Sequence, residues 1–111
     1  MTPARGTIVR TWSARADSAG AGNYSRYFAD TLLPQLRELP GFGGGYLLRR
    51  DLDEGGTVEL TTHTFWESVA AIQAFAGDDI TRSIVEPEAQ AMLHDFDRTA
   101  AHRNVVVDAR G

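Results

Sequence analysis

The run TVELTTHTFW, residues 57–66, constrains the fold more than any other part of the sequence. It is rich in β-branched and aromatic residues and is typical of a strand. Successive side chains on a strand point to opposite faces of a sheet. One face carries Val58, Leu60, Thr62, Thr64 and Trp66, and the other carries Glu59, Thr61, His63 and Phe65. Both faces mix apolar and polar groups, so we expect both to be covered.

The segments before this run predict a strand, a helix and a second strand. The first strand is expected over residues 7–12, followed by a loop over the small residues 14–22. Apolar residues then recur at helical spacing from the N-cap residue Asn23 to Leu39, where Pro40 and Gly41 end the helix. Pro34 predicts a kink in it. Strand residues 44–51 and the hairpin turn DEGG, residues 53–56, lead into the central run.

Helix follows the central run directly. Apolar residues between Val69 and Ala76 share one face, and Gly77 is expected to end this helix with a positive φ. Pro87 suits the first turn of a last helix. One side of that helix would carry Ala89, Met92, Leu93 and Phe96. Residues 101–107 are expected to form the closing strand.

This order of elements predicts an α+β protein of the ferredoxin-like βαββαβ type with a four-stranded antiparallel sheet. We expect residues 1–111 to form one domain. Helices would cover one face of the sheet and leave the other bare. Pairing two such faces across a two-fold axis would cover both, so the sequence predicts a homodimer.

The composition of the chain argues against several classes of function. The net charge is −4 and the arginines are scattered, which argues against a nucleic-acid or anionic-membrane partner. The absence of cysteine rules out disulfides and thiolate metal sites. No stretch is apolar enough to cross a bilayer or to act as a signal segment, so we expect a cytoplasmic protein. The three histidines have no chelating spacing, so no metal site is expected.

Four stretches carry a resemblance to a known family: PGFGGGYLLRR, TFWESVAAIQAFAG, AMLHDFD and AAHRNVVV. They resemble the antibiotic biosynthesis monooxygenase-like family of dimeric α+β barrel proteins, over residues 7–107. The resemblance implies a ferredoxin-like subunit, a barrel formed by the two sheets of a dimer, and a small-molecule pocket between each sheet and its own helices. The family includes cofactor-free oxygenases of aromatic polyketides and haem-degrading enzymes, and fold alone does not choose among their activities.

The resemblance also implies which residues of this chain occupy the family's functional positions. Trp66 matches the pocket tryptophan of the polyketide oxygenases, whereas Thr62 stands where they have asparagine. Their pocket tyrosine falls at Ile72, and their arginine falls near Glu86. The axial histidine of the haem-degrading members would fall within residues 75–77, where this chain has none. The resemblance therefore implies no haem and no other cofactor.

Trp66 and the histidines are the candidates for chemistry. Trp66 is either a core residue or a pocket wall, where its ring would stack on an aromatic substrate and its N–H would bind an oxygen. His63 faces away from Trp66 on a regular strand, and is either a hydrogen-bonded structural residue or a general base. The same two interpretations hold for His102, whereas His94 is expected to face solvent. We take Trp66, His63 and His102 as catalytic candidates.

The glycine run GFGGGY precedes a strand rather than a helix, which does not fit a dinucleotide fingerprint and favours close packing at a strand start. Arg49 and Arg50 follow it on opposite faces, so one of them can face a cavity and bind an anion. The substrate-binding candidates are Thr62, Tyr46, Arg49, Ile72 and Phe75.

Three functions remain open on the sequence. The first is a cofactor-free monooxygenase that acts on an aromatic or polyketide-like substrate. The second is a non-redox acid-base enzyme of the cyclase or dehydratase type on the same fold. The third is a barrel that binds a hydrophobic small molecule without turnover.

Overall fold

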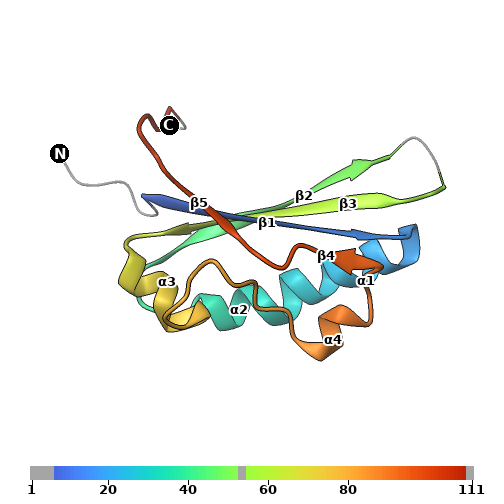
Figure 1. Cartoon of the computed structure of the whole chain (residues 1–111), viewed down its shortest axis with the longest axis horizontal. Helices are drawn as coiled ribbons and strands as arrows, with labels where there is room; N and C mark the ends of the chain where they lie inside the picture. The colour runs from blue at the N-terminus through green and yellow to red at the C-terminus, as the bar shows by residue number, and fades with distance from the viewer. Residues whose placement is uncertain (1–6, 53–54, 110–111) are drawn as a thin grey trace.

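The computed structural model describes residues 7–52 and 55–109. Its helices lie together against one face of a twisted sheet, and Figure 1 shows the two layers. The elements are, in chain order, β1 (Ile8–Ala16), α1 (Ser18–Tyr27), the π-helical turn η1 (Phe28–Leu32), α2 (Leu33–Leu36), β2 (Phe42–Asp51), β3 (Val58–Trp66), α3 (Val69–Ala76), α4 (Pro87–Gln90), β4 (Asp95–Phe96) and β5 (Ala101–Asn104).

The strands pair in the order β2-β3-β1, and all pairings are antiparallel. The outer edge of β1 pairs with β4 at Ala14 and Arg15, and with β5 along Ile8 to Thr11. The fourth strand of the predicted sheet is therefore split into two short pieces. The predicted ferredoxin-like α+β fold is confirmed, whereas the single-domain organisation stays a prediction. Within the described residues, no helix has the length and apolarity needed to cross a membrane.

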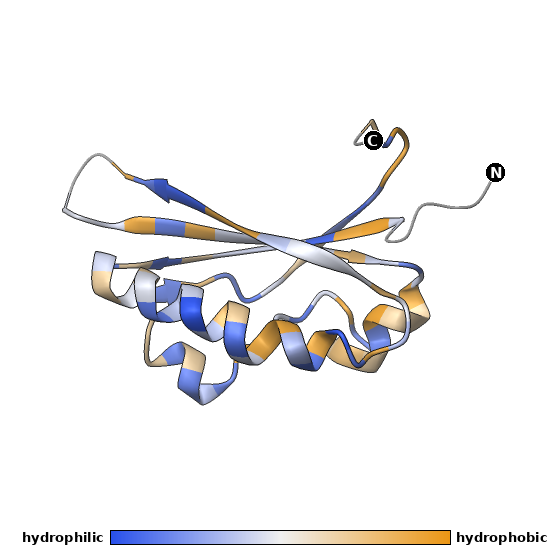
Figure 2. Ribbon diagram, turned by 180° about the vertical axis from the view of Figure 1, so that it is seen from behind, coloured by the Kyte–Doolittle hydropathy of each residue, from blue (hydrophilic) through white to orange (hydrophobic). Residues whose placement is uncertain are grey.

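Buried and partly exposed residues alternate along β3 as predicted, except that Phe65 near its end is also buried. Figure 2 shows hydrophobic and hydrophilic residues along both the strands and the helices. The even-numbered residues of β3 are buried beneath the helices: Val58, Leu60, Thr62, Thr64 and Trp66. Of these, Val58, Leu60 and Trp66 contribute to two hydrophobic clusters between sheet and helices. One cluster surrounds Trp12 and Tyr24, and the other surrounds Trp66 and Ile72.

The first helix begins earlier than predicted, so the expected loop over residues 14–22 is wrong. Asp17 caps α1 by accepting a hydrogen bond from the Gly20 amide at 2.7 Å. A Cβ atom on Gly20 would lie 2.2 Å from the Met92 carbonyl oxygen. The small residues that suggested a loop instead allow this helix to pack closely against the segment after α4.

Pro34 disturbs the helix one turn before its own position. Proline has no N–H to donate within the helix. The backbone widens into η1, where the N–H of Leu33 bonds to the carbonyl of Phe28. The helical stretch then ends after α2 with Leu39 and Phe42 in turn-type hydrogen bonds, close to the predicted end.

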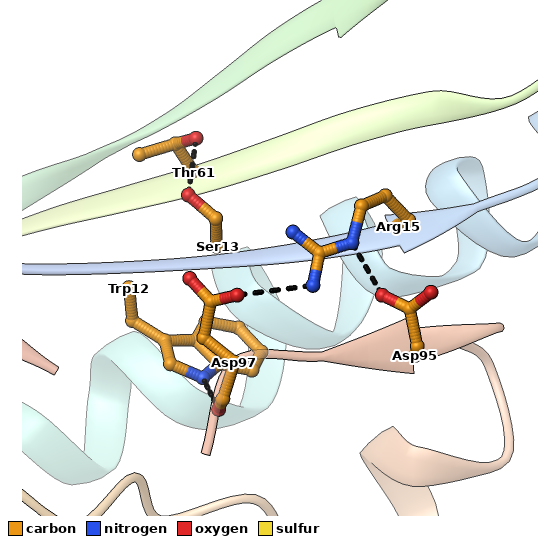
Figure 3. Close-up of polar contacts among 6 residues, drawn as sticks. All are labelled: Trp12, Ser13, Arg15, Thr61, Asp95 and Asp97. Atoms are coloured by element: carbon orange, nitrogen blue, oxygen red, sulfur yellow. Dashed lines mark hydrogen bonds and ion pairs between the residues drawn. The ribbon is translucent and has the colours of Figure 1, made fainter. Parts of the chain in front are cut away.

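The last helix is much shorter than predicted, because the chain leaves it to pair with β1. The predicted side of Ala89, Met92, Leu93 and Phe96 does not form; α4 ends at Gln90 and Phe96 lies in β4. The indole N–H of Trp12 donates to the Asp97 carbonyl at 2.8 Å, and Arg15 forms ion pairs with Asp95 and Asp97 (Figure 3). These contacts hold β4 at the edge of the sheet.

The remaining boundaries are close to those expected. β1 runs past the predicted strand to Ala16, and β5 ends at Asn104, earlier than predicted. Gly77 ends α3 with a φ of 86°, as predicted. Of the predicted DEGG turn, Asp53 and Glu54 lie outside the described residues, and the adjoining Gly55 and Gly56 have positive φ.

The glycine run packs closely, as predicted. A bulge lies between Phe42 and Gly45, and a Cβ atom on Gly45 would lie 2.6 Å from the His63 carbonyl oxygen.

We expect Gly45→Ala to lower the free energy of unfolding by roughly 1–3 kcal/mol, because the backbone of β3 must move. In Gly22→Ala, where the nearest atom lies 3.9 Å away within α1, we expect a gain of about 0.5–1 kcal/mol. Urea denaturation of both variants checks this, and an unchanged Gly45→Ala protein would contradict the close approach.

Candidate functional site

A narrow cavity lies between the sheet and the helices, where the two hydrophobic clusters meet. Its walls come from β1, β3, the first helical stretch, α3 and the segment before α4. They are formed by Arg10, Trp12, Tyr24, Phe28, Leu32, Leu36, Thr62, Thr64, Trp66, Phe75, Ser83 and Ile84. The volume that water can occupy in this cavity is only about 40 Å³, which is enough for a few water molecules. A larger ligand must therefore displace side chains. Four wall residues also line an adjoining cavity of similar size: Tyr24, Leu32, Phe75 and Ile84.

Arg10 is the charged residue of the cavity wall. It is 5% exposed, and burial lowers its pKa to about 10. Its guanidinium donates to the Ile80 carbonyl and, at 2.8 Å, to the Arg82 carbonyl. It also lies over the Phe75 ring, 5.7 Å from the centroid. Within the described residues no carboxylate forms an ion pair with Arg10, so its guanidinium contacts only uncharged groups.

His102 lies beside Arg10 but is not among the residues that line the cavity. Its Nε2 is 3.0 Å from Nη1 of Arg10, and the two residues are paired across β1 and β5. A guanidinium can only donate, so Nε2 accepts and the ring is neutral with its proton on Nδ1. Partial burial and the charge of Arg10 lower the pKa of His102. The lone pair that a general base would use is therefore already engaged.

Trp66 is both a core residue and a wall of the cavity. It is fully buried, with its ring stacked on Phe75 at 5.9 Å and edge-on to Phe42 at 5.2 Å. Its indole N–H donates to the Thr64 hydroxyl at 2.9 Å. The N–H that was expected to bind a substrate oxygen is thus occupied, and the Thr64 hydroxyl proton can donate in its place.

The other predicted residues divide between the two faces of the sheet. Thr62 and Phe75 line the cavity, whereas Ile72 is fully buried beside Trp66 and lies behind the wall. His63 and Tyr46 form a pair on the opposite face, because strand alternation directs both away from the helices. The structure therefore does not bring them together with Trp66.

Arg49 and His94 take no part in the cavity. Arg49 is on the helix side of β2 but is half-exposed and forms an ion pair with Asp51 at 2.8 Å, so its charge is already matched. His94 is exposed, as expected, and follows α4 rather than lying within a helix. The expectation that an arginine faces a cavity is met by Arg10 instead.

Sequence reasoning missed Arg10, Tyr24 and Thr64 as site residues. The signal for Arg10 was present, because the period of two places it on the same face as Ile8 and Trp12 in the first strand. An inward arginine between apolar residues is unusual for a strand buried beneath helices. The signal for Tyr24 was weaker, since it reads equally well as part of the apolar stripe of a helix.

The cavity does not fit haem or a metal. No histidine or carboxylate is among its lining residues. The Nε2 atom of His102 contacts the Arg10 guanidinium, and this positive charge opposes binding of a metal cation through Nε2. Within the described part of the chain, no group of three or more His, Asp or Glu side chains is placed to bind a metal ion.

Comparison with solved structures places this fold. A monooxygenase from the gene ActVA-Orf6 of Streptomyces coelicolor, crystallised with the ligand nanaomycin D, matches with a TM-score of 0.59 and 17% identity, over 96% of this chain and 94% of that one. The chain has the antibiotic biosynthesis monooxygenase-like fold. The heme-degrading protein Rv3592 from Mycobacterium tuberculosis matches with a TM-score of 0.53 and 25% identity, over 94% of this chain and 97% of that one. In sequence, the chain matches no protein-family model and no curated protein.

The Arg10–His102 contact predicts a pH-dependent stability. The pKa of His102 is lowered from its ordinary value of 6.5, so the unfolded chain takes up the proton first as pH falls. Stability from the neutral ring is fully present above pH 6.5 and is lost as pH falls through the folded pKa. We expect His102→Gln to remove this loss. Urea denaturation across this pH range measures it, and identical profiles for both proteins would contradict the assignment.

Proposed function

We propose that this chain is a cofactor-free monooxygenase that oxidises an electron-rich aromatic substrate in the cavity beneath the sheet. One observation carries the proposal: the cavity combines aromatic walls with one buried, unmatched arginine, in the fold of a known monooxygenase. The walls would hold an aromatic ring by stacking and burial. Arg10 would stabilise the negative charge that forms when such a substrate ionises.

The chemistry needs dioxygen and no bound group. The substrate enters as an anion that has already lost its proton to solvent, and this anion transfers one electron to dioxygen to give a substrate radical and superoxide. These combine at carbon to form a peroxide, which loses water to leave a carbonyl. A methylene carbon and one dioxygen thus yield a ketone and one water. The protein supplies orientation in a dry cavity and stabilises the anion.

The lining of the cavity disfavours the acid-base alternative. A cyclase or dehydratase needs a proton acceptor at the substrate. No histidine or carboxylate is among the lining residues, and the lone pair of His102 is engaged by Arg10. An oxidation that begins from an already acidic substrate needs only anion stabilisation. Ligand binding without turnover is the remaining alternative.

Oxygen consumption tests the reaction. Metal-stripped protein should consume oxygen with a panel of anthrones and hydroquinones. We expect Trp66→Phe to lower kcat/KM about tenfold, because it loses part of the stacked wall and the hydrogen bond to Thr64. His102→Ala should also lower it by loosening Arg10, while His94→Ala, at an exposed site, should leave it unchanged. Ligand binding with no protein-dependent uptake would contradict oxygenation and favour the silent barrel.

We also propose that the bare face of the sheet pairs with a second copy. The helices cover only the other face (Figure 1). On the bare face Tyr46 and Leu48 are 46% and 44% exposed, and Tyr46 packs edge-on against Phe65. A second sheet would remove this apolar surface from water.

Sedimentation at micromolar concentration tests the dimer. We expect a species near twice 12.1 kDa for the wild-type chain. Leu48→Glu should shift it toward monomer by placing a charge in the interface. Val106→Glu is the matched control, because Val106 is 90% exposed and lies beyond β5. A folded wild-type monomer would rule out the barrel.

A further inference from the structure

The polar groups that border the cavity include several hydrogen-bond donors, which restricts the ligand. Every polar side-chain atom cut off from solvent has a hydrogen-bond partner within the described residues. There the Arg10 contacts all involve Nη1 or Nη2, so the Nε–H without a partner borders open space. The open space that Arg10 lines is the cavity. One donor of the buried guanidinium is therefore available to a ligand in the cavity.

Tyr24 adds a second donor. Its side chain is buried and lines both the cavity and the adjoining one. Burial raises the pKa of the phenol well above its ordinary value, so its hydroxyl keeps its proton at neutral pH. A buried neutral phenol donates a hydrogen bond to a negatively charged oxygen more strongly than to a neutral one. The Thr64 hydroxyl, which accepts from Trp66, is a third donor on the same wall.

Charge leads to the same conclusion. A buried guanidinium is costly unless an opposite charge compensates it. Arg10 meets two carbonyl oxygens, a neutral imidazole and an aromatic ring among the described residues. A ligand with one negative group would supply the missing charge, and its apolar body would contact the aromatic walls.

We propose that the cavity binds planar aromatic molecules that already carry a negative group at neutral pH, a carboxylate or an acidic phenol, with that group on Arg10 and Tyr24. This inference specifies the substrate class of the proposed function. It rests on the proposed function only for the place where the substrate binds. Neutral aromatic molecules of the same shape leave Arg10 uncompensated and bind more weakly.

A matched pair of probes tests this. Benzoate and benzamide have nearly the same shape and differ in charge. Trp12 and Trp66 are the two tryptophans of the chain and both line the cavity, so their indole N–H resonances report binding there. We expect benzoate to shift both resonances with a dissociation constant at least about tenfold below that of benzamide.

Two variants locate the charge that matters. Arg10→Met should abolish the preference for benzoate. Arg103→Met, which removes the same charge on the other face of β5, should keep it. If Arg10→Met does not fold, the Nε–H resonance of Arg10 in the wild-type protein decides, because benzoate should shift it and benzamide should not. Equal affinities, or no shift of the indole resonances at millimolar benzoate, would overturn the proposal.

The experiments distinguish failure of the anion-site proposal from failure of the monooxygenase proposal. Benzoate preference without oxygen uptake would refute the monooxygenase and leave the anion site standing. Oxygen uptake from neutral anthrones, with no preference for benzoate, would refute the anion site and leave the monooxygenase standing.

Discussion

The buried guanidinium of Arg10 is the constraint on which the rest of the site depends. It links β1 to His102 in β5 and to the carbonyls of Ile80 and Arg82 in the segment that closes the cavity. Those links bring three parts of the chain that are distant in sequence around one space. They satisfy hydrogen bonds without neutralising the charge, so the cavity retains a positive potential. Without Arg10 the cavity would have only neutral polar groups, such as the hydroxyls of Tyr24 and Thr64, to orient a ligand.

The aromatic residues give that charge its surroundings. Trp12, Tyr24, Trp66 and Phe75 all contribute to the walls of the cavity. The polar ends of the two indoles are bonded to the Asp97 carbonyl and the Thr64 hydroxyl, which leaves their flat faces as walls. A low-dielectric wall strengthens the field of a nearby charge, so the rings and the arginine act together on a bound anion.

The layout of the fold could be predicted from the sequence because the strand period and the turn residues agree with one another. Trp66, Thr62 and Phe75 could be placed by period and by resemblance. The short strand β4 could not be predicted, because the apolar spacing around Met92 and Phe96 fits a helix as well as an edge strand. The segment forms a strand because Asp95 pairs with Arg15 of β1. The strand period places Arg10 on the inward face, but its contacts with residues 80, 82 and 102 are not visible in a local pattern.

The proposed site lies between the sheet and its helices rather than on the open face of the sheet. A crystal structure of the protein grown with benzoate tests this most directly. We expect the benzoate ring to lie against the aromatic walls of this cavity, with the carboxylate within hydrogen-bond distance of Arg10. Benzoate bound instead beside His63 and Tyr46 on the opposite face, with the cavity unchanged, would contradict it.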